Sequence, residues 1–259
     1  MNFLDKIKYR NLISKIKIKL EELNVDYVDI EILYNIVTPH KEIIFNYFKH
    51  YFDFVYVDKE GQITTQEDFG KYLRDLLLKE KLSILEFGTW NGLGSTKIIF
   101  DNPTIAHSIE INPFIYSIAK KNLLPIKKEH KLILGKIIDT GNTKIDLKES
   151  YFSNEFNEKR NQVDMWLGSL VHIIFTCEAD LIIDSLDEYY DVLLIDGGVL
   201  TTYDEFLIIN ERIKKYIFLD DLNGSKGIKI FDYLSKNSNY DMVFESKTRK
   251  ACVFKKELK

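Results

Sequence analysis

Cysteine, proline and long apolar runs are scarce in this sequence. Its 259 residues include 2 cysteines, Cys177 and Cys252, and 4 prolines. The cysteines form neither a metal-type nor a redox-type pair, so we expect two free, reduced thiols and no disulfide. No stretch approaches the roughly 20 apolar residues of a transmembrane helix. The charged segment MNFLDKIKYRNLISKIKIKL also lacks the apolar core of a secretory signal. We therefore expect a cytoplasmic protein with no stable membrane insertion.

A large excess of charge of one sign is absent as well. Lysine and arginine number 36, and aspartate and glutamate number 40, which gives a formal net charge of −4. Such a chain has no general attraction for phosphate backbones, so we expect no nucleic-acid partner. Hydrophobic residues make up 45% and aromatic residues 13%, which indicates a globular protein with a sizeable core. The sequence leaves open whether the chain forms a homo-oligomer.

The segment ILEFGTWNGLGST, residues 84–96, is the most informative part of the sequence. A short apolar strand reaches an acid, Glu86, and then a turn with Gly88 and Gly92, followed by a helix-compatible run. Glycines let backbone amides approach a ligand closely, because no Cβ is in the way and positive φ angles cost little. A strand, a glycine turn and a helix N-terminus form a site for the polar part of a nucleotide-like cofactor. The alternative is a turn that needs glycine for its geometry alone.

A second strand follows after the length of one helix. The segment TIAHSIEINP, residues 104–113, is apolar and carries Glu110 where the predicted strand ends. An acid at the tip of the second strand of a βαβ unit lies where a ribose presents its hydroxyls, and a carboxylate can accept hydrogen bonds from both. The two segments together therefore favour a cofactor site over a purely structural turn.

From Leu82 onward the sequence alternates between strand-like and helix-like segments. This alternation predicts a doubly wound α/β fold, in which a mostly parallel sheet has helices on both faces. The segments YDMVFES and KACVFKK, separated by a short polar turn, predict a closing hairpin. Within residues 1–63, apolar positions recur at helical spacing, and we expect a helical extension that covers the acceptor side. Residues 64–259 are expected to form the main domain, whose first helix opens with a capping box at Thr64 to Glu67.

Three aspartates follow two later strands. Asp196 ends the segment YDVLLID, and Asp220 and Asp221 end YIFLDD. In a doubly wound sheet, ligands bind across the carboxyl ends of the strands, so these side chains should meet at one edge. Carboxylates gathered there would repel one another unless a cation or protons intervened, and a hard cation such as Mg²⁺ suits such a cluster. The alternative is that Asp220 and Asp221 cap the next helix, while Asp196 contacts only cofactor or substrate.

The motifs EFGTWNGLGS and IEINP resemble those of the class I S-adenosylmethionine-dependent methyltransferases, most closely the catechol O-methyltransferase-like branch. The resemblance spans roughly residues 82–256 and implies a seven-stranded Rossmann-like sheet with an antiparallel last strand. It implies S-adenosyl-L-methionine as the cofactor and a divalent cation bound by Asp196, Asp220 and Asp221. The cofactor contacts that it implies are Glu86, Gly88, Thr89, Trp90, Asn91, Gly92, Glu110, Ile111, Gly135, Lys136 and Asp196.

The sequence departs from these relatives at the proton acceptor. The catechol enzymes carry a lysine three residues after the metal-binding aspartate, and this chain has Val199 there. The candidates for the catalytic base are then Asp196, Tyr203, Lys226 or a histidine. A metal ion that lowers the pKa of the acceptor oxygen would lessen the need for a side-chain base.

Two further patterns, DGG-x-x-TTY-x-EF and LDD-x-x-x-x-K, resemble bacterial or viral methyltransferases encoded among sugar and surface-polysaccharide genes. They imply O-methylation of a small or glycan-like acceptor, such as a nucleotide sugar, a capsular or surface glycan, or a phosphate-type oxygen. One rival is a nicotinamide-dependent sugar oxidoreductase or epimerase, disfavoured by the glycine spacing and by the lack of a Tyr-x-x-x-Lys pair in the later half. The other is a non-catalytic binding partner that keeps the cofactor fold as a scaffold.

Overall fold

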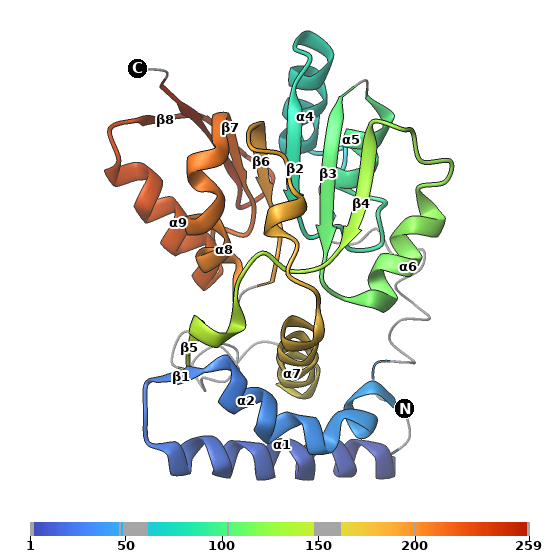
Figure 1. Cartoon of the computed structure of the whole chain (residues 1–259), viewed down its shortest axis with the longest axis vertical. Coiled ribbons are helices and arrows are strands. Elements are labelled where there is room, and N and C mark those ends of the chain that lie inside the picture. Colours follow the sequence, from blue (N-terminus) through green and yellow to red (C-terminus); the bar gives the residue numbers. More distant parts are fainter. Residues whose placement is uncertain are drawn as a thin grey trace. The chain divides into compact units, whose positions relative to one another are not determined.

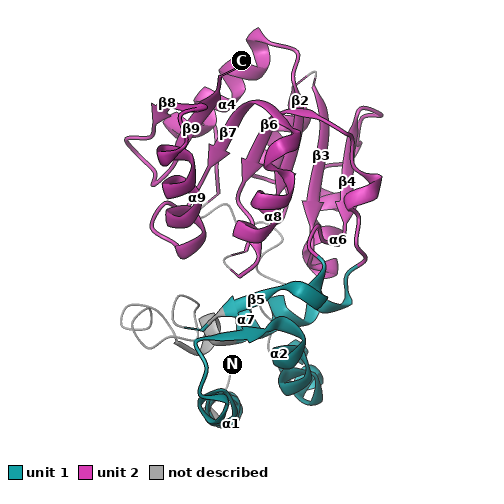
Figure 2. Cartoon of the chain, turned by 60° about the vertical axis from the view of Figure 1, so that its left-hand side comes forward, with its two compact units in different colours: residues 1–53, 139–179 teal, residues 54–138, 180–259 magenta. Residues whose placement is uncertain are grey.

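The structure is a computed structural model that describes residues 3–46, 48, 62–102, 104–147, 162–198 and 200–257. The chain divides into two compact units, which Figure 2 colours separately. Unit 1 comprises residues 1–53 and 139–179, and unit 2 comprises residues 54–138 and 180–259. Unit 1 is therefore assembled from two stretches of chain that are distant in sequence.

Unit 2 is built on a seven-stranded sheet (Figure 1). In spatial order its strands are β4 (His130–Leu134), β3 (Ile105–Glu110), β2 (Ser83–Phe87), β6 (Tyr190–Ile195), β7 (Ile213–Leu219), β9 (Cys252–Lys256) and β8 (Tyr240–Glu245). The pairs from β4 to β7 are parallel, whereas β9 runs antiparallel to both β7 and β8. This arrangement confirms the predicted mostly parallel sheet, its closing hairpin and its antiparallel last strand.

The direction of winding reverses between β2 and β6. The chain passes from β2 to β3 and β4 toward one edge, and later from β6 to β7 toward the other edge. Because parallel strands end at the same side of the sheet, the segments that follow β2 and β6 meet beside this reversal. In open α/β sheets such a switch point is the usual place for a ligand.

Helices cover both faces of the sheet. The helices of unit 2 are α4 (Asp68–Lys79), α5 (Ser95–Asp101), α6 (Pro113–Asn122), α8 (Thr202–Ile209) and α9 (Ser225–Lys236), with short 3-10 helices at Ile183–Ser185 and Asn210–Arg212. Successive residues of a strand point to opposite faces of the sheet and pack in two different apolar clusters, as expected for strands buried on both faces. Ile84 packs in the cluster that holds α4, α5 and α6 residues, and its neighbour Leu85 packs in the cluster that holds α8 and α9 residues.

The predicted capping box at the start of α4 is wrong. The helix begins at Asp68, and its N-cap residue, Glu67, makes no side-chain capping hydrogen bond. Both acids instead bond to the turn between β8 and β9, since Asp68 accepts from Ser246 and Glu67 from Arg249. The side chains of Glu67 and Asp68 therefore bond to residues distant in sequence and do not form the capping box that the sequence pattern predicted.

Unit 1 contains helices and one short antiparallel strand pair. Its elements are α1 (Phe3–Leu23), β1 (Tyr27–Asp29), α2 (Ile30–Val37), a 3-10 helix at Thr38–His40, another at Thr140–Asn142, β5 (Lys144–Asp146) and α7 (Gln162–Glu178). Strand β1 pairs with β5, and α2 packs against α7. The ring of Phe45 stacks on that of Phe175 at 5.4 Å. Helices near the start of the chain agree with the apolar spacing, but strands of three residues are too short to show a period.

Both cysteines are free thiols, as expected: Cys177 lies in α7 and Cys252 begins β9. Among the described residues, no helix is both long enough and apolar enough to cross a lipid bilayer.

Candidate functional site

The turn after β2 requires glycine at Gly88. Its φ angle is +83°, and a Cβ on this residue would lie 2.4 Å from the backbone oxygen of Asp196. The Gly88 amide donates to the oxygen of Ile109 at 3.0 Å, and the Asp196 amide donates to the oxygen of Phe87 at 2.9 Å. The glycine turn is therefore held directly against the end of β6, across the switch point of the sheet.

Glu110 is joined to this turn by hydrogen bonds. Its Oε2 atom accepts from the backbone amide and the hydroxyl of Thr89, at 3.3 and 3.2 Å, and its Oε1 atom accepts from the amide of Asn112 at 2.9 Å. The side chain is buried, which raises the pKa of Glu110, while the hydrogen bonds from Asn112 and Thr89 lower it. The two predicted cofactor segments thus form a single structural site.

The rest of the glycine turn is braced by amide side chains. Trp90 and Gly92 have positive φ angles of 47° and 78°. Asn91 is buried, its Oδ1 accepts from Nε2 of Gln62 at 2.7 Å, and its backbone oxygen accepts from Asn122 at 2.9 Å. Gln62 and Asn122 were not among the predicted site residues. These contacts fix the shape of the turn before any ligand binds.

Glu86 lies beneath the turn and has no exposed surface. Its two carboxylate oxygens accept from the hydroxyls of Ser95, at 2.5 Å, and Ser108, at 2.6 Å. Burial raises the pKa of Glu86 to about 7, against the lowering effect of these hydrogen bonds. The geometry therefore favours a positioning role, in which Glu86 ties the first turn of α5 to strands β2 and β3.

The predicted adenine-side residues follow β4. The amide of Gly135 donates to the oxygen of Glu110 at 3.1 Å, so this position lies beside the end of β3. A Cβ on Gly135 would meet Ile182, which explains the glycine. The next residue, Lys136, is buried and donates its amide to the oxygen of Asp180, while Ile111 is partly buried after β3. These residues lie at the same end of the parallel strands as the glycine turn.

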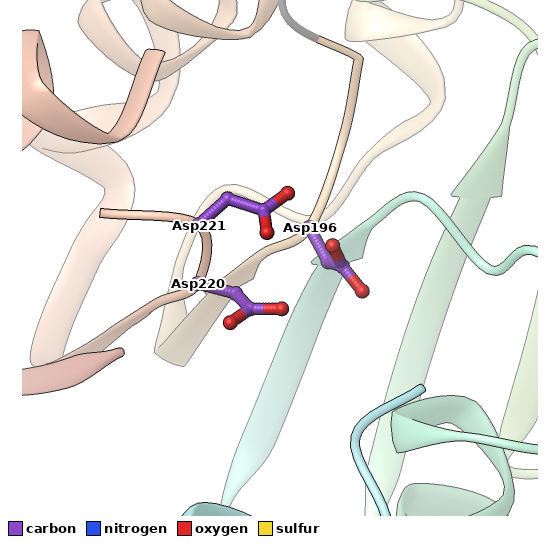
Figure 3. A group of neighbouring side chains, drawn as sticks. All are labelled: Asp196, Asp220 and Asp221. Carbon is purple, nitrogen blue, oxygen red and sulfur yellow. The ribbon is translucent and has the colours of Figure 1, made fainter. Parts of the chain in front are cut away.

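The three predicted aspartates converge at the ends of β6 and β7 (Figure 3). One carboxylate oxygen from each lies within 4.8 Å of the others. The side chain of Asp220 is only 1% exposed, whereas those of Asp196 and Asp221 are 28% and 49% exposed. Asp221 also has a positive φ angle of 59°. Two of the three carboxylates are therefore partly exposed, and the third is buried.

Lys226, in the first turn of α9, brings a positive charge to this cluster. Its Nζ atom donates to the backbone oxygen of Gly197 and lies 3.3 Å from Asp221 and 4.0 Å from Asp196. Burial raises the pKa of Asp196 well above its usual range, Asp220 and Asp221 raise it further, and Lys226 and Arg249 counteract them. As a buried hydrogen-bond donor, Lys226 fits the role of a charge partner better than that of a proton acceptor.

Arg249 brings the second positive charge, and it was not among the predicted site residues. Its Nε atom donates to Oδ1 of Asp220 at 2.7 Å, and an Nη atom donates to Oδ2 at 2.5 Å. The other Nη atom contacts Glu67 at 3.3 Å. Such a bidentate fork is among the stronger charge-assisted pairings in proteins, so Asp220 and Arg249 are tightly matched.

A resident divalent cation does not fit this arrangement of donors. Mg²⁺ needs near-octahedral oxygen ligands at about 2.0–2.1 Å. Both oxygens of Asp220 are already engaged by Arg249, and the ammonium of Lys226 lies beside Asp196 and Asp221. An ion would have to break the bidentate pair or sit next to a buried positive charge. Among the described residues, the positive charges that contact the cluster are those of Lys226 and Arg249.

The remaining base candidates are dispersed. Tyr203 packs against the apolar cluster beneath α8 and α9, and the Nζ atom of Lys229 lies 5.9 Å from the centre of its ring. His107 bonds to the hydroxyl of Tyr190 at 2.6 Å within the core. Val199 lies outside the described residues. Glu205, which was not among the predicted site residues, has its pKa raised to about 7 by burial, against hydrogen bonds from Thr202 and Thr201.

No protein-family model and no curated protein sequence matches the chain. Among solved structures, cofactor-bound Rv0187 from MTB is similar over 82% of this chain and 88% of its own, at 12% identity and a TM-score of 0.50. The O-methyltransferase from Bacillus cereus in complex with SAH gives 14% identity over 88% of this chain and 100% of its own, with a TM-score of 0.49. The O-methyltransferase TomG from Streptomyces achromogenes, in complex with SAM, is 13% identical over 73% of this chain and 79% of its own, with a TM-score of 0.45. The likeness to Rv0187 concerns the fold, and the strand order is that of the Rossmann-like methyltransferase fold.

Proposed function

We propose that this chain is an S-adenosylmethionine-dependent methyltransferase that methylates an oxygen of a small or glycan-like acceptor. The observation that carries the proposal is the joined site at the switch point of the sheet. There the glycine turn after β2 is bonded through Thr89 to Glu110 and lies against Asp196 at the end of β6. A preformed turn, an acid on the neighbouring strand and a carboxylate across the switch point suit a cationic nucleoside.

Each part of the cofactor has a matching part of the site. The turn at Gly88 to Gly92 is proposed to border the methionine part, and the carboxylate of Glu110 to accept from the ribose hydroxyls. Gly135 and Lys136 are proposed to border the adenine. Glu86 is proposed to act indirectly, because its carboxylate is buried beneath the turn.

The aspartate cluster is proposed to face the sulfonium and the acceptor. In methyl transfer the acceptor oxygen attacks the methyl carbon in line with the carbon–sulfur bond. That bond breaks, the electron pair returns to sulfur, and the acceptor hydroxyl gives its proton to a base. The chain mainly has to align the two reactants and take up this proton.

Asp196 is the base that the geometry favours. Its carboxylate is partly exposed at the end of β6, and burial together with its acidic neighbours raises its pKa, which makes it a better proton acceptor. Tyr203 and Lys226 remain predictions from the sequence, but Tyr203 packs on the apolar core and Lys226 acts as a donor.

The acceptor class rests on the sequence patterns around Asp196 and Asp220. They resemble methyltransferases of sugar and surface-polysaccharide genes, so a nucleotide sugar, a capsular glycan or a phosphate-type oxygen is the proposed acceptor class. Asp196 and Asp221 are both exposed enough to accept hydrogen bonds from neighbouring hydroxyls of a sugar ring.

Calorimetry with the full chain tests the cofactor. We expect S-adenosylhomocysteine to bind and NAD not to bind, and the reverse would favour the nicotinamide-dependent rival. A transfer assay with radiolabelled methyl groups against a panel of nucleotide sugars then tests the reaction. Cofactor binding without transfer to any acceptor would favour the non-catalytic rival.

A further inference from the structure

We infer that Lys226 and Arg249 take the place of a divalent cation at the aspartate cluster, and that Arg249 is a positioning residue for Asp220. The inference deepens the proposed function, because it concerns the same site. It predicts a site that works without a metal ion, in contrast to the cation that the sequence patterns imply.

The first support is the balance of charge. Three carboxylates meet at the cluster, and two cations of the chain, Lys226 and Arg249, contact them. Arg249 also contacts Glu67, so four carboxylates, counted as ionised, face two cations and a net negative charge remains. S-adenosylmethionine brings one positive charge at its sulfonium, which this negative charge would attract. A divalent ion in addition would leave the site with an excess of positive charge.

The second support is the geometry of Asp220. Its side chain is 1% exposed, and both of its oxygens are taken by the guanidinium of Arg249. The planar fork of arginine matches a carboxylate in a way that lysine and spherical ions do not. Asp220 therefore forms a buried ion pair in which both of its oxygens accept from Arg249.

The third support is the way the chain delivers Arg249 to this place. The carboxylate of Asp68 accepts from the hydroxyl of Ser246 at 2.5 Å, the amide of Lys247 at 2.6 Å and the hydroxyl of Thr248 at 2.7 Å. The hydroxyl of Ser246 in turn accepts from the amide of Arg249 at 3.0 Å. The turn between β8 and β9 is thus tied to the start of α4.

The sheet register completes this placement. Leu219, the last residue of β7, pairs with Cys252, the first residue of β9. The antiparallel insertion of β9 therefore brings the preceding turn level with the aspartates that follow β7. Glu67 at the N-cap of α4 holds the far side of the guanidinium. The turn between β8 and β9, the start of α4 and the end of β7 thus all contact Arg249 or hold its turn in place. A solvent-exposed arginine on the surface makes fewer such contacts.

Direct measurement of Mn²⁺ binding tests the inference without any need for activity. Free Mn²⁺ has an electron paramagnetic resonance signal that falls when the ion binds, and Mg²⁺ can compete for the same site. With the full wild-type chain we expect no stoichiometric loss of this signal. In Arg249→Gln the oxygens of Asp220 become free, so we expect Mn²⁺ to bind at least about tenfold more tightly than to the wild type.

Matched variants separate the site from general effects. Arg74→Gln removes an arginine that pairs with Asp75 on the exposed surface, and it should behave as the wild type. Arg249→Gln combined with Asp220→Asn should lose the gained site. Arg249→Lys restores the charge without the fork and should bind Mn²⁺ more weakly than Arg249→Gln. Circular dichroism checks that each variant is folded, and if Arg249→Gln fails to fold, Mn²⁺ binding by the wild type and by Asp220→Asn decides the question.

Two results would overturn the inference. One is stoichiometric Mn²⁺ binding by the wild type that Asp220→Asn removes. The other is a folded Arg249→Gln chain that binds Mn²⁺ no better than the wild type. Calorimetry with S-adenosylhomocysteine, before and after treatment with a chelator, keeps the two proposals apart. Failure of the wild type to bind this nucleoside would count against the proposed function, and the Mn²⁺ result would still decide the question of the cation.

Discussion

Glu86 and Ser108 face each other in register on strands β2 and β3, and the Ser108 hydroxyl donates to Glu86 at 2.6 Å. Ser95, in the first turn of α5, holds the other oxygen of the same carboxylate. An acid without exposed surface is thus kept at the base of the glycine turn by two neutral donors. Because no positive charge lies among its hydrogen-bond partners, burial dominates and raises the pKa of Glu86 to about 7.

The first prediction concerns the stability of the protein as a function of pH. A carboxyl whose pKa is raised in the folded state stabilises the fold most below its unfolded value, near 4.5, and this contribution is lost as pH rises toward about 7. Replacing Glu86 with Gln removes that dependence. We expect the stability of Glu86→Gln relative to the wild type to rise by roughly 2 kcal/mol from pH 5 to pH 8. Urea unfolding at both pH values measures it, and a difference independent of pH would contradict it.

The second prediction concerns the close approach at Gly88. Gly88→Ala should reduce the affinity for S-adenosylhomocysteine at least about tenfold, because alanine disfavours a φ angle of +83° and its Cβ would collide with the Asp196 backbone. Gly168→Ala in α7 is the matched control, since a Cβ there meets nothing within 4 Å. It should leave binding unchanged and stabilise the helix by about 0.5–1 kcal/mol. Calorimetry measures the affinity for S-adenosylhomocysteine, and thermal unfolding measures the stability. Equal affinity in both variants would show that the turn does not contact the nucleoside.

The third prediction concerns the acid that ends β3. In Glu110→Gln a charged acceptor of ribose hydroxyls is lost, and such hydrogen bonds contribute about 1.5–3 kcal/mol, so affinity for S-adenosylhomocysteine should fall roughly 10- to 100-fold. The exposed Glu129 offers a control substitution, Glu129→Gln, that keeps the same change in net charge. Unchanged affinity in Glu110→Gln would show that the ribose binds elsewhere.

The fourth prediction separates the charged cofactor from its neutral product. Asp196→Asn removes a negative charge from the cluster that is proposed to face the sulfonium. Affinity for S-adenosylmethionine should fall roughly tenfold, while affinity for the uncharged S-adenosylhomocysteine changes much less, because the lost term is electrostatic. Asp101→Asn, at a surface ion pair with Lys97, is the control. An equal loss for both ligands would place the sulfonium away from Asp196.

Much of this fold could be predicted because its signals are local. Alternating apolar segments predicted the parallel sheet, and the topology of such sheets predicted that Asp196, Asp220 and Asp221 lie at one edge. Three carboxylates at one edge also predicted that a cation or protons would intervene. The pattern of residues does not distinguish a metal ion from a cationic side chain.

The missing information lay in long-range contacts. Arg249 lies in a short polar turn, where an arginine is ordinarily expected to be exposed to solvent. A signal did exist, since an antiparallel last strand inserted beside β7 must begin where β7 ends, next to Asp220. Gln62 gave no such signal, because it precedes α4 in a segment without periodicity and reaches Asn91 only through the fold.

Unit 1 has a consequence for how the chain assembles. Its strand β1 pairs with β5, matching Tyr27 with Asp146, and its helix α2 packs on α7. All of β2, β3 and β4 is synthesised between these partners. Strand β1 and helix α2 therefore cannot make these contacts until β5 and α7 have been synthesised, and contacts of such wide separation slow folding. Unit 1 can form only after β2, β3 and β4 have been synthesised.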